Sequence, residues 1–335
     1  MQLISREDVE HIFNNQPSLP FELVERAFEE KIQGNVLLPD KISQVFDQET
    51  QDRINCLPAT LLRQKVSGVK WVSVFPSNAA KALLNVTAVI ILSSIETGYP
   101  LAMIDGTYCT ALRTAAVGAV ATKYLSRADS QVIGLIGAGE QAEMHFRMIN
   151  AVRTIRECYV SSRTEASERR LVSSLQEEYP DVRFVTCKGD HNKATERADI
   201  IVTAVSCQRP LLKANYVKEG ATYIHVGGWE DEYAVVEKAD KIVCDDWESV
   251  KHRSQTISRM YYEGLLRDND IYGNLDEIIA GSLPARENER EFIYFNSVGL
   301  GFIDVMFAHE IYEQCEVRNL GVEYRIQGNA GVVKR

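Results

Sequence analysis

Hydrophobic and polar residues in the first third of the chain follow two patterns in turn, first helical and then typical of strands. Ser5 precedes a helical run and Asp8 lies three residues later, which is the arrangement of a helix N-cap. A second helix is expected to begin at Pro20 and to end at Gly34, with its apolar residues on one face. Beyond it, apolar runs separated by turn residues predict strands at 68–75, 87–92 and 100–104. Paired strands with helices outside them indicate an α+β unit.

The pattern changes in the middle of the chain. A helix crowded with Ala and Gly is expected over 107–125, where small side chains let neighbouring backbones come close. From residue 131 onward, short apolar runs alternate with charged helical segments, which indicates βαβ units and a parallel sheet. The expected strands are 131–136, 157–162, 183–186, 200–205, 222–226 and 241–244, and the expected helices are 141–152, 165–179, 247–267 and a segment after residue 299.

A glycine-rich loop follows the first strand of this series. It reads Gly137-Ala138-Gly139-Glu140-Gln141-Ala142 and matches the pattern G-x-G-x-x-G/A between a strand and a helix. Gly137 permits a tight turn, Gly139 lacks the Cβ that would collide with a pyrophosphate, and Ala142 allows close packing of helix on sheet. The helix N-terminus offers N–H groups to the phosphates. The loop therefore predicts a dinucleotide site in a Rossmann domain; the alternative is a turn without a ligand.

The end of the next strand bears on which dinucleotide binds. In an NAD site, a carboxylate about 20 residues beyond the loop takes the ribose hydroxyl. This chain has no carboxylate there and instead has Ser162, Arg163 and Thr164, a cation between two hydroxyls that suits a 2′-phosphate. NADP(H) is therefore expected over NAD(H). The alternative is that Arg163 is an ordinary solvated loop residue.

Two cations stand in apolar surroundings in the first third of the chain. Arg113 is the only charged residue between Asp105 and Lys123, and Lys70 lies in a strand whose two faces are both largely apolar. An unpaired buried cation is strongly destabilising, so Arg113 needs either a protein carboxylate or a substrate carboxylate in a bidentate contact. For Lys70 the alternatives are proton transfer with a lowered pKa and a structural ion pair. Together with the dinucleotide loop, these cations suggest hydride transfer at the carbon next to a carboxylate.

The composition limits the classes of function. The 335 residues carry a net charge of −10, with 45% hydrophobic and 25% charged residues, and exceed one ordinary core. An acidic chain is a poor partner for nucleic acid or an anionic membrane, and no apolar run of roughly 18 residues appears. Seven scattered cysteines without histidines at ligand spacing predict reduced thiols and no metal site. The charged first residues and the lack of a long apolar run favour a cytoplasmic protein. His225 and His309 are expected to be core histidines.

These motifs together make the sequence similar to the ornithine cyclodeaminase and mu-crystallin family. The resemblance extends along nearly the whole chain in family order, through Gly68-Val69-Lys70, Phe75-Pro76-Ser77-Asn78, Glu96-Thr97-Gly98-Tyr99-Pro100-Leu101-Ala102, Thr110-Ala111-Leu112-Arg113-Thr114-Ala115-Ala116, the Gly137 loop, and Ser297-Val298-Gly299 with Asp304. It implies a homodimer whose Rossmann NAD(P)-binding domain spans 127–306. A substrate-binding and dimerisation domain would comprise 1–126, completed by 307–335.

The resemblance also implies roles for single residues. Lys70 and Arg113 match positions that contact the substrate carboxylate, Thr110 and Thr114 flank that site, and Lys41 stands where the family has an arginine. Lys41, Lys70, Thr110 and Arg113 are thus expected to bind substrate, with Lys70 and Arg113 also catalytic. The residues expected at the cofactor are Thr114, Gly137, Ala138, Gly139, Glu140, Gln141, Ser162, Arg163, Thr164, Val205, Ser206, Ser297 and Gly299.

One position separates this chain from the ornithine cyclodeaminases. Those enzymes carry an aspartate directly after a Gly-Ala or Gly-Gly pair, whereas Gly227-Gly228 is followed here by Trp229 and then by Glu230-Asp231. Glu230 is the expected substitute as a catalytic base. A bulky indole at the aspartate position makes ornithine cyclisation the weaker interpretation.

Within the family, the chain looks most like a siderophore-pathway branch. That branch oxidatively cleaves N-(2-amino-2-carboxyethyl)-L-glutamate to 2,3-diaminopropionate and 2-oxoglutarate, and it uses NAD, whereas Arg163 favours NADP. The similarity lies in Asp52-Arg53-Ile54, Lys238-Ala239-Asp240-Lys241, Asp245-Asp246-Trp247, Glu263-Gly264 and 281–287. The sequence thus predicts an NAD(P)-dependent oxidoreductase acting on CH–NH or CH–NH2 groups. The alternatives are a ketimine reductase of the pyrroline-2-carboxylate type, an ornithine cyclodeaminase, and an NADPH-binding protein without turnover.

Overall fold

The computed structural model describes residues 1–325 and divides the chain into two compact units. The first unit consists of Met1–Arg113 and the described residues from Leu300 onward, and the second of Thr114–Gly299. The divisions fall after Arg113, within a helix, and after Gly299, whereas the expected boundaries lie after residues 126 and 306. Of the segment 307–335 that is expected to complete the first domain, residues 326–335 lie outside the described part.

The first unit is a mostly antiparallel sheet with helices packed on it. Its strands are β1 (Gln2–Ile4), β2 (Val36–Leu37), β3 (Ile42–Val45), β4 (Arg53–Leu61), β5 (Val66–Val74), β6 (Val86–Ser94), β7 (Pro100–Asp105) and β18 (Val322–Glu323). Its helices are α1 (Arg6–Asn14), α2 (Leu19–Ile32), the 3-10 helix η1 (Pro76–Lys81) and α11 (Gly301–Arg318), and α3 (Gly106–Leu125) begins here. The strand order is β18-β1-β7-β6-β5-β4-β2, β3 also pairs with β4, and only β1 and β7 run parallel.

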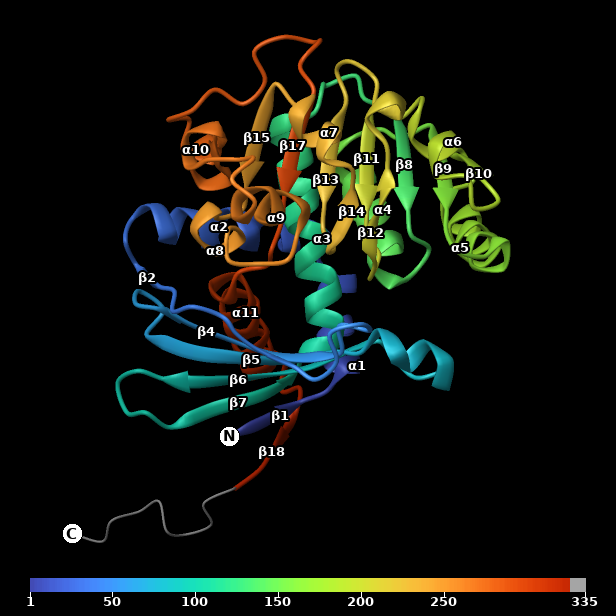
Figure 1. The fold of residues 1–335 in the computed structure, drawn as a ribbon. Coiled ribbons are helices and arrows are strands. Elements are labelled where there is room, and N and C mark those ends of the chain that lie inside the picture. The colour runs from blue at the N-terminus through green and yellow to red at the C-terminus, as the bar shows by residue number, and fades with distance from the viewer. Residues whose placement is uncertain (326–335) are drawn as a thin grey trace, which may run out of the picture. The chain divides into compact units, whose positions relative to one another are not determined.

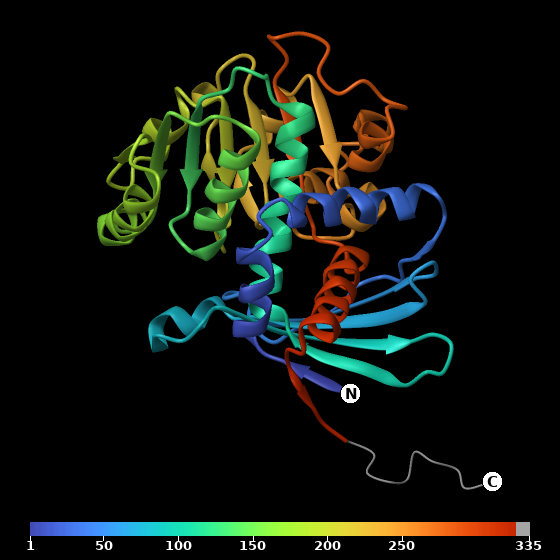
Figure 2. The same ribbon diagram turned by 180° about the vertical axis from the view of Figure 1, so that it is seen from behind.

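The core of the first unit lies between one face of this sheet and the helices. Helix α11 crosses β4, β5 and β6, as Figure 2 shows from behind. Phe13 of α1 stacks on Phe307 of α11, and Phe28 of α2 meets Phe302 edge to face. The expected N-cap at Ser5 is confirmed, because its hydroxyl accepts the Asp8 N–H and its own N–H reaches the Asp8 carboxylate.

The second unit is a parallel sheet with helices on both faces, so the expected Rossmann-type α/β architecture is confirmed (Figure 1). Its order is β10-β9-β8-β11-β13-β17-β15-β16, and every neighbouring pair is parallel. These strands are β8 (Val132–Ile136), β9 (Glu157–Ser161), β10 (Arg183–Thr186), β11 (Ile200–Thr203), β13 (Thr222–His225), β15 (Lys241–Cys244), β16 (Gly273–Asn274) and β17 (Ile293–Asn296). A separate parallel pair joins β12 (Gln208–Leu212) and β14 (Trp229–Asp231).

The helices of the second unit follow the strands in βαβ fashion. They are α4 (Glu140–Val152), α5 (Glu165–Glu178), α6 (His191–Thr195), η2 (Ala214–Tyr216), α7 (Tyr233–Glu237), α8 (Trp247–Val250), α9 (Thr256–Tyr262), η3 (Asp268–Asp270) and α10 (Leu275–Ile279). Figure 2 shows α4 and the end of α3 against one face of the sheet. The small residues of α3 allow this packing, because a Cβ on Gly118 would lie 2.8 Å from His145 Cδ2. The expected helical stretch over 247–267 is two short helices, α8 and α9.

No helix within residues 1–325 is both long enough and apolar enough to cross a membrane.

Candidate functional site

The turn between β8 and α4 contains the glycine-rich loop that the sequence predicts to bind phosphate. Gly137 has a φ of 125°, which favours glycine, and its N–H donates to Ser161 O at 2.8 Å. A Cβ on Gly137 would lie 2.8 Å from Ala204 O, so the neighbouring strand end leaves no room for a side chain. The turn therefore brings the ends of β8, β9 and β11 together beside the start of α4.

The N-terminus of α4 is open to an anion. Ala138 and Gly139 lead into the helix, Gly139 is its N-cap without a side-chain hydrogen bond, and Glu140 and Gln141 form its first turn. A Cβ added to Gly139 would meet nothing within 4 Å. Uncapped N–H groups at the end of a 13-residue helix, beside open space, suit the pyrophosphate of a dinucleotide. The residues present thus fit a nicotinamide dinucleotide.

The residues after β9 divide into two groups. Ser162 is buried and its hydroxyl donates to Thr164 O at 3.0 Å, while Thr164 caps α5 through its own hydroxyl. Their side chains therefore hold the turn, and their expected contact with a 2′-phosphate stays a prediction. Arg163 is exposed, and no hydrogen bond or ion pair holds its side chain within the described residues, so its guanidinium is available to a ligand.

A carboxylate that no sequence motif marks, that of Glu168, shapes the same turn. Glu168 of α5 is fully buried and accepts the N–H of Ser162 at 2.8 Å, that of Lys188 at 2.7 Å and that of Gly189 at 2.8 Å. It therefore ties the end of β9 to the loop after β10. The signal in the sequence was a glutamate near the start of a helix that follows a polar turn, which is too common to single out a residue.

Glu230 of β14 was expected to act as a base, but its carboxylate is bound by groups of the protein itself. It is fully buried, and its carboxylate accepts the N–H of Val205 at 2.7 Å, the N–H of Gly227 at 2.9 Å and the Thr203 hydroxyl at 2.7 Å. Burial raises the pKa of the Glu230 carboxyl, and these donors oppose that rise. Both oxygens already have protein partners, so the geometry favours a structural role that joins the loops after β11 and β13.

A second buried carboxylate, Asp245, organises the loop after β17. One oxygen, Oδ2, accepts the Ser297 hydroxyl at 3.0 Å and the N–H groups of Val298 and Gly299 at 2.8 and 3.0 Å. Burial raises the pKa of Asp245. The Ser297 hydroxyl is thus engaged with protein, and Gly299 has a φ of 77°. On the loop after β11, Val205 is half-buried and Ser206 exposed.

The two predicted cations lie together in the first unit around a single carboxylate. Lys70 of β5 and Arg113 of α3 are 1% and 5% exposed, and Asp304 of α11 is fully buried. Lys70 Nζ lies 2.7 Å from Asp304 Oδ1, and Arg113 Nε lies 2.8 Å from the same oxygen. A protein carboxylate is therefore a partner of Arg113. We refer to these three residues as the Lys70–Asp304–Arg113 triad.

Some polar atoms of the triad have hydrogen-bond partners and others have none within the described residues. Burial, followed by the charge of Arg113, lowers the pKa of Lys70 to about 8, and the Asp304 carboxylate opposes this shift. Within the described residues, Arg113 Nη1 and Asp304 Oδ2 are buried without a hydrogen-bond partner. Buried donors and acceptors are nearly always paired, so a free guanidinium donor indicates a place for an acceptor such as a carboxylate.

The remaining predicted residues of the first domain lie outside this triad. Thr110 and Thr114 are buried on α3, on either side of Arg113 in the sequence, and Thr114 already belongs to the second unit. Lys41 is half-buried in the loop between β2 and β3. Asp304 was noted only as part of a family motif; its signal was a lone carboxylate in the apolar run 302–308, the same kind of signal that marked Arg113.

Comparison with known proteins relates this chain to amino-acid and imino-acid oxidoreductases. It is 33% identical over 325 residues to alanine dehydrogenase of Archaeoglobus fulgidus, covering 95% of this chain and 96% of that one. It is 29% identical to a Δ1-pyrroline-2-carboxylate reductase of Bacillus cereus, covering 96% and 98%. It is 25% identical to N-((2S)-2-amino-2-carboxyethyl)-L-glutamate dehydrogenase of Staphylococcus aureus, covering 96% and 97%.

Two solved structures match the whole fold. The Δ1-pyrroline-2-carboxylate reductase of Thermococcus litoralis, in complex with NADH and L-proline, has a TM-score of 0.91 and 33% identity over 97% of this chain and all of that one. An archaeal alanine dehydrogenase dimer with bound NAD has a TM-score of 0.89 and 32% identity over 97% and 99%. The model of the ornithine cyclodeaminase/mu-crystallin family matches residues 2–319. The chain therefore belongs to the ornithine cyclodeaminase/mu-crystallin family.

Proposed function

We propose that this protein is an NAD(P)-dependent oxidoreductase that exchanges hydride at an amine-bearing carbon next to a carboxylate. The observation that carries the proposal is the Lys70–Asp304–Arg113 triad, which keeps one buried guanidinium donor free. The open N-terminus of α4 supports the dinucleotide part, and three relatives along the whole chain are named as dehydrogenases or reductases of amino or imino acids.

Each group of residues has a distinct task in this proposal. Arg113 binds the substrate carboxylate through Nη1, while Asp304 fixes the orientation of both cations. Lys70, with a pKa lowered to about 8, can give up or take up a proton near neutral pH. Gly137, Gly139 and the first turn of α4 hold the pyrophosphate, and Val205, Ser206 and the 297–299 loop border the nicotinamide. When bound, the nicotinamide ring supplies or accepts the hydride.

Two substrates compete within this class. The siderophore-branch motifs favour oxidative cleavage of N-(2-amino-2-carboxyethyl)-L-glutamate, and a relative with that activity in its name is 25% identical. Identities of 29% and 33% are to Δ1-pyrroline-2-carboxylate reductases, one of which is solved with L-proline, and an alanine dehydrogenase is also 33% identical. Reduction of a cyclic imino acid is therefore an equal candidate.

A spectrophotometric screen separates these candidates. NAD(P)H formation or loss is followed with N-(2-amino-2-carboxyethyl)-L-glutamate, pyrroline-2-carboxylate, proline, alanine and ornithine. We expect Arg113→Met to abolish turnover. Arg26→Met, which changes an exposed arginine, should retain it. Ornithine giving proline and ammonia without net reduced cofactor would instead identify a cyclodeaminase. Tight NADPH binding without turnover of any substrate would identify a non-catalytic binding protein.

For the cofactor, we propose that Arg163 favours NADP(H) through the 2′-phosphate. The support is an exposed guanidinium at the tip of β9 with no partner within the described residues. The two solved relatives contain NADH and NAD, so NAD(H) is the competing choice. Arg163→Ala is expected to weaken NADPH binding roughly tenfold or more and to leave NADH binding unchanged, whereas Arg170→Ala, an exposed arginine of α5, should change neither. Equal affinities for both cofactors, unchanged in Arg163→Ala, contradict the preference.

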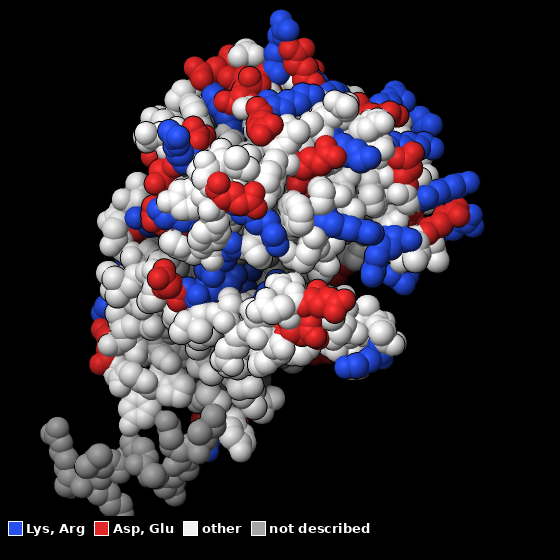
Figure 3. Space-filling view, in the orientation of Figure 1, with Lys and Arg blue, Asp and Glu red and all other residues white. Residues whose placement is uncertain are grey.

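We also propose that a second copy of the chain covers the outer face of the first-unit sheet. Trp71, Ile91 and Met103 are 41%, 40% and 39% exposed on neighbouring strands, and Ile91 pairs with both Val69 and Met103. Figure 3 shows few charged side chains over β4 to β7. An apolar face of this kind is typical of an interface, and one solved relative is a dimer.

The cytoplasmic location and the siderophore pathway remain predictions from the sequence.

A further inference from the structure

A fully buried histidine, His225, ends β13 at the loop edge of the parallel sheet. Its Nδ1 lies 2.5 Å from Asn296 Oδ1 on the neighbouring strand β17, and its Nε2 lies 2.9 Å from Gly228 O. Strands β13 and β17 run side by side in the middle of the sheet (Figure 1). Both ring nitrogens therefore face oxygen atoms, and the number of ring protons depends on whether each oxygen is an acceptor.

The hydrogen bonds around the ring decide this question. Gln255 Nε2 donates to two carbonyl oxygens, those of Gly227 and Ser297, each at 2.9 Å, which fixes the orientation of the Gln255 amide. Its Oε1 must then accept from Asn296 Nδ2, at 2.8 Å. Asn296 consequently turns Oδ1 toward His225, so Nδ1 carries a proton. Because Gly228 O can only accept, Nε2 carries a proton as well.

A ring with two protons is a buried cation and needs counter-charges. Two carboxylates of β14 provide them: Glu230 Oε2 lies 3.4 Å and Asp231 Oδ1 3.6 Å from His225 Nε2. Burial raises the pKa of both carboxyls, and the neighbouring His225 opposes the rise. The other groups that face the ring are Tyr223 of β13 and Tyr294 of β17, with ring centres 5.8 and 5.9 Å away.

We propose that His225 is held as an imidazolium and serves as a positioning residue for the nicotinamide-facing loops. The inference rests on the proposed function, which assigns the loops after β11 and β17 to the cofactor; the loop after β13 lies between them in the hydrogen-bond network. His225 fixes Gly228 directly. Through Asn296 and Gln255 it also fixes Gly227 and Ser297, while its counter-charge Glu230 fixes Val205 and Gly227. A single buried charge thus holds the geometry of three loops.

The protonation state is measured first, on the whole protein labelled with ¹⁵N-histidine. The His225 signals are identified by their absence in His225→Gln. Both ring nitrogens are expected to carry a proton at about pH 7.5, because each donates to an oxygen that can only accept. An unprotonated nitrogen at this pH overturns the proposal. This measurement is independent of cofactor binding, so it decides the point even if the protein binds no dinucleotide, a result that would refute the proposed function alone.

The positioning role is then tested by kinetics and folding. His225→Gln is expected to raise the KM for the dinucleotide roughly tenfold, with a smaller change in the KM for the amino or imino acid. His225→Gln with Asp231→Asn restores the charge balance, so it should recover thermal stability but not the dinucleotide KM. The control is His309→Gln, a half-buried histidine of α11. If the double variant recovers both the thermal stability and the dinucleotide KM, the role of His225 is structural only. The same conclusion follows if His225→Gln leaves the dinucleotide KM unchanged.

Discussion

At the scale of single residues, the state of Lys70 depends on what surrounds it. The side chain is buried beside Arg113, which disfavours its charge, and its salt-bridge partner within residues 1–325, Asp304, is shared with that arginine. Its pKa is lowered from 10.5 to about 8 as a result. Burial of Lys70 and Arg113 was predicted from their apolar neighbours in the sequence and is confirmed.

The lowered pKa of Lys70 predicts a pH dependence of stability. Between about pH 8 and pH 10.5 the unfolded chain keeps the Lys70 proton while the folded chain releases it, so the unfolded state binds more protons. The free energy of unfolding due to Lys70 therefore increases with pH across this interval. Denaturant unfolding at about pH 7.5 and about pH 9.5 should show a larger increase for the wild type than for Lys70→Met.

The matched control is Lys65→Met, in the turn between β4 and β5, directly before the strand that carries Lys70. Lys65 is exposed and the Glu96 carboxylate raises its pKa, so it contributes nothing between these two pH values. Equal pH dependence in the wild type and in Lys70→Met would show that Lys70 keeps its ordinary pKa.

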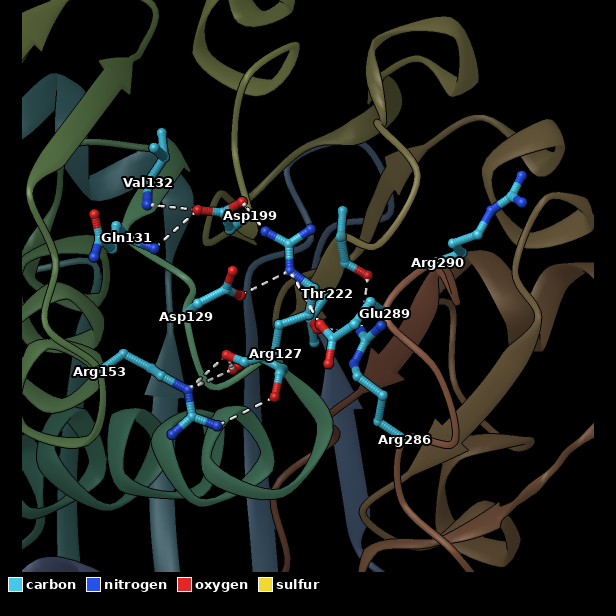
Figure 4. Close-up of polar contacts among 12 residues, drawn as sticks. Arg127, Asp129, Gln131, Val132, Arg153, Asp199, Thr222, Arg286, Glu289 and Arg290 are labelled. Carbon is cyan, nitrogen blue, oxygen red and sulfur yellow. Dashed lines mark hydrogen bonds and ion pairs between the residues drawn. The ribbon is translucent and has the colours of Figure 1, made fainter.

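At the scale of elements, the C-terminal end of α3 is held by arginines from other segments (Figure 4). Arg153, directly after α4, donates to the carbonyl oxygens of Thr122, Lys123, Ser126 and Arg127. Arg286 donates to Leu125 O at 2.8 Å. Cations at a helix C-terminus satisfy its free carbonyls and interact favourably with its dipole.

Arg153→Met is therefore expected to lower the free energy of unfolding by about 2 kcal/mol, because several carbonyl oxygens lose a charged donor. Arg169→Met removes only an exposed pair with Glu165 and should change stability by less than about 0.5 kcal/mol. Urea unfolding of both variants measures the difference. Similar losses in the two variants would mean that Arg153 does not support α3.

Strand β4 shows why some elements escaped prediction. Pro58 interrupts its sequence pattern, because proline lacks the N–H that a central strand donates. In the sheet, β3 pairs with Arg53 to Cys56 and β2 with Thr60 and Leu61, so Pro58 falls between them, where neither strand pairs with β4. The N–H that Pro58 lacks therefore leaves no carbonyl of β2 or β3 without a donor. This follows from how β2 and β3 pair with β4, which the sequence alone does not show.

At the scale of the whole molecule, the proposed dimer gives a direct prediction. Trp71→Glu places a carboxylate in the middle of the apolar outer face of the first-unit sheet. In the dimer, one such carboxylate from each subunit would be buried. We expect the dimer dissociation constant to rise at least about tenfold, while the monomer stays folded because Trp71 is already 41% exposed. Sedimentation across a range of concentrations measures the change.

The control for this prediction is Val317→Glu on α11, which alters an isolated valine that is 80% exposed. It should leave the association state unchanged. A wild-type protein that is monomeric at micromolar concentration, or a Trp71→Glu variant that dimerises normally, would contradict the assignment of this face.

The sequence by itself determined the features that depend on neighbours along the chain. The alternation of strands and helices from residue 131, the Gly137 loop and the Ser5 cap follow from periodicity and from local backbone requirements, which a few consecutive residues specify. The family assignment followed from the same short motifs.

Only the tertiary structure decided which groups meet. Asp304 lies 234 positions from Lys70 and 191 from Arg113, and no periodicity relates residues so far apart. The same holds for Glu230, which was expected as a base and has both oxygens bound to loop donors, and for His225, whose two protons follow from Asn296 and Gln255. The charge state of a buried group is set by the partners that the fold brings to it, and the local sequence does not specify them.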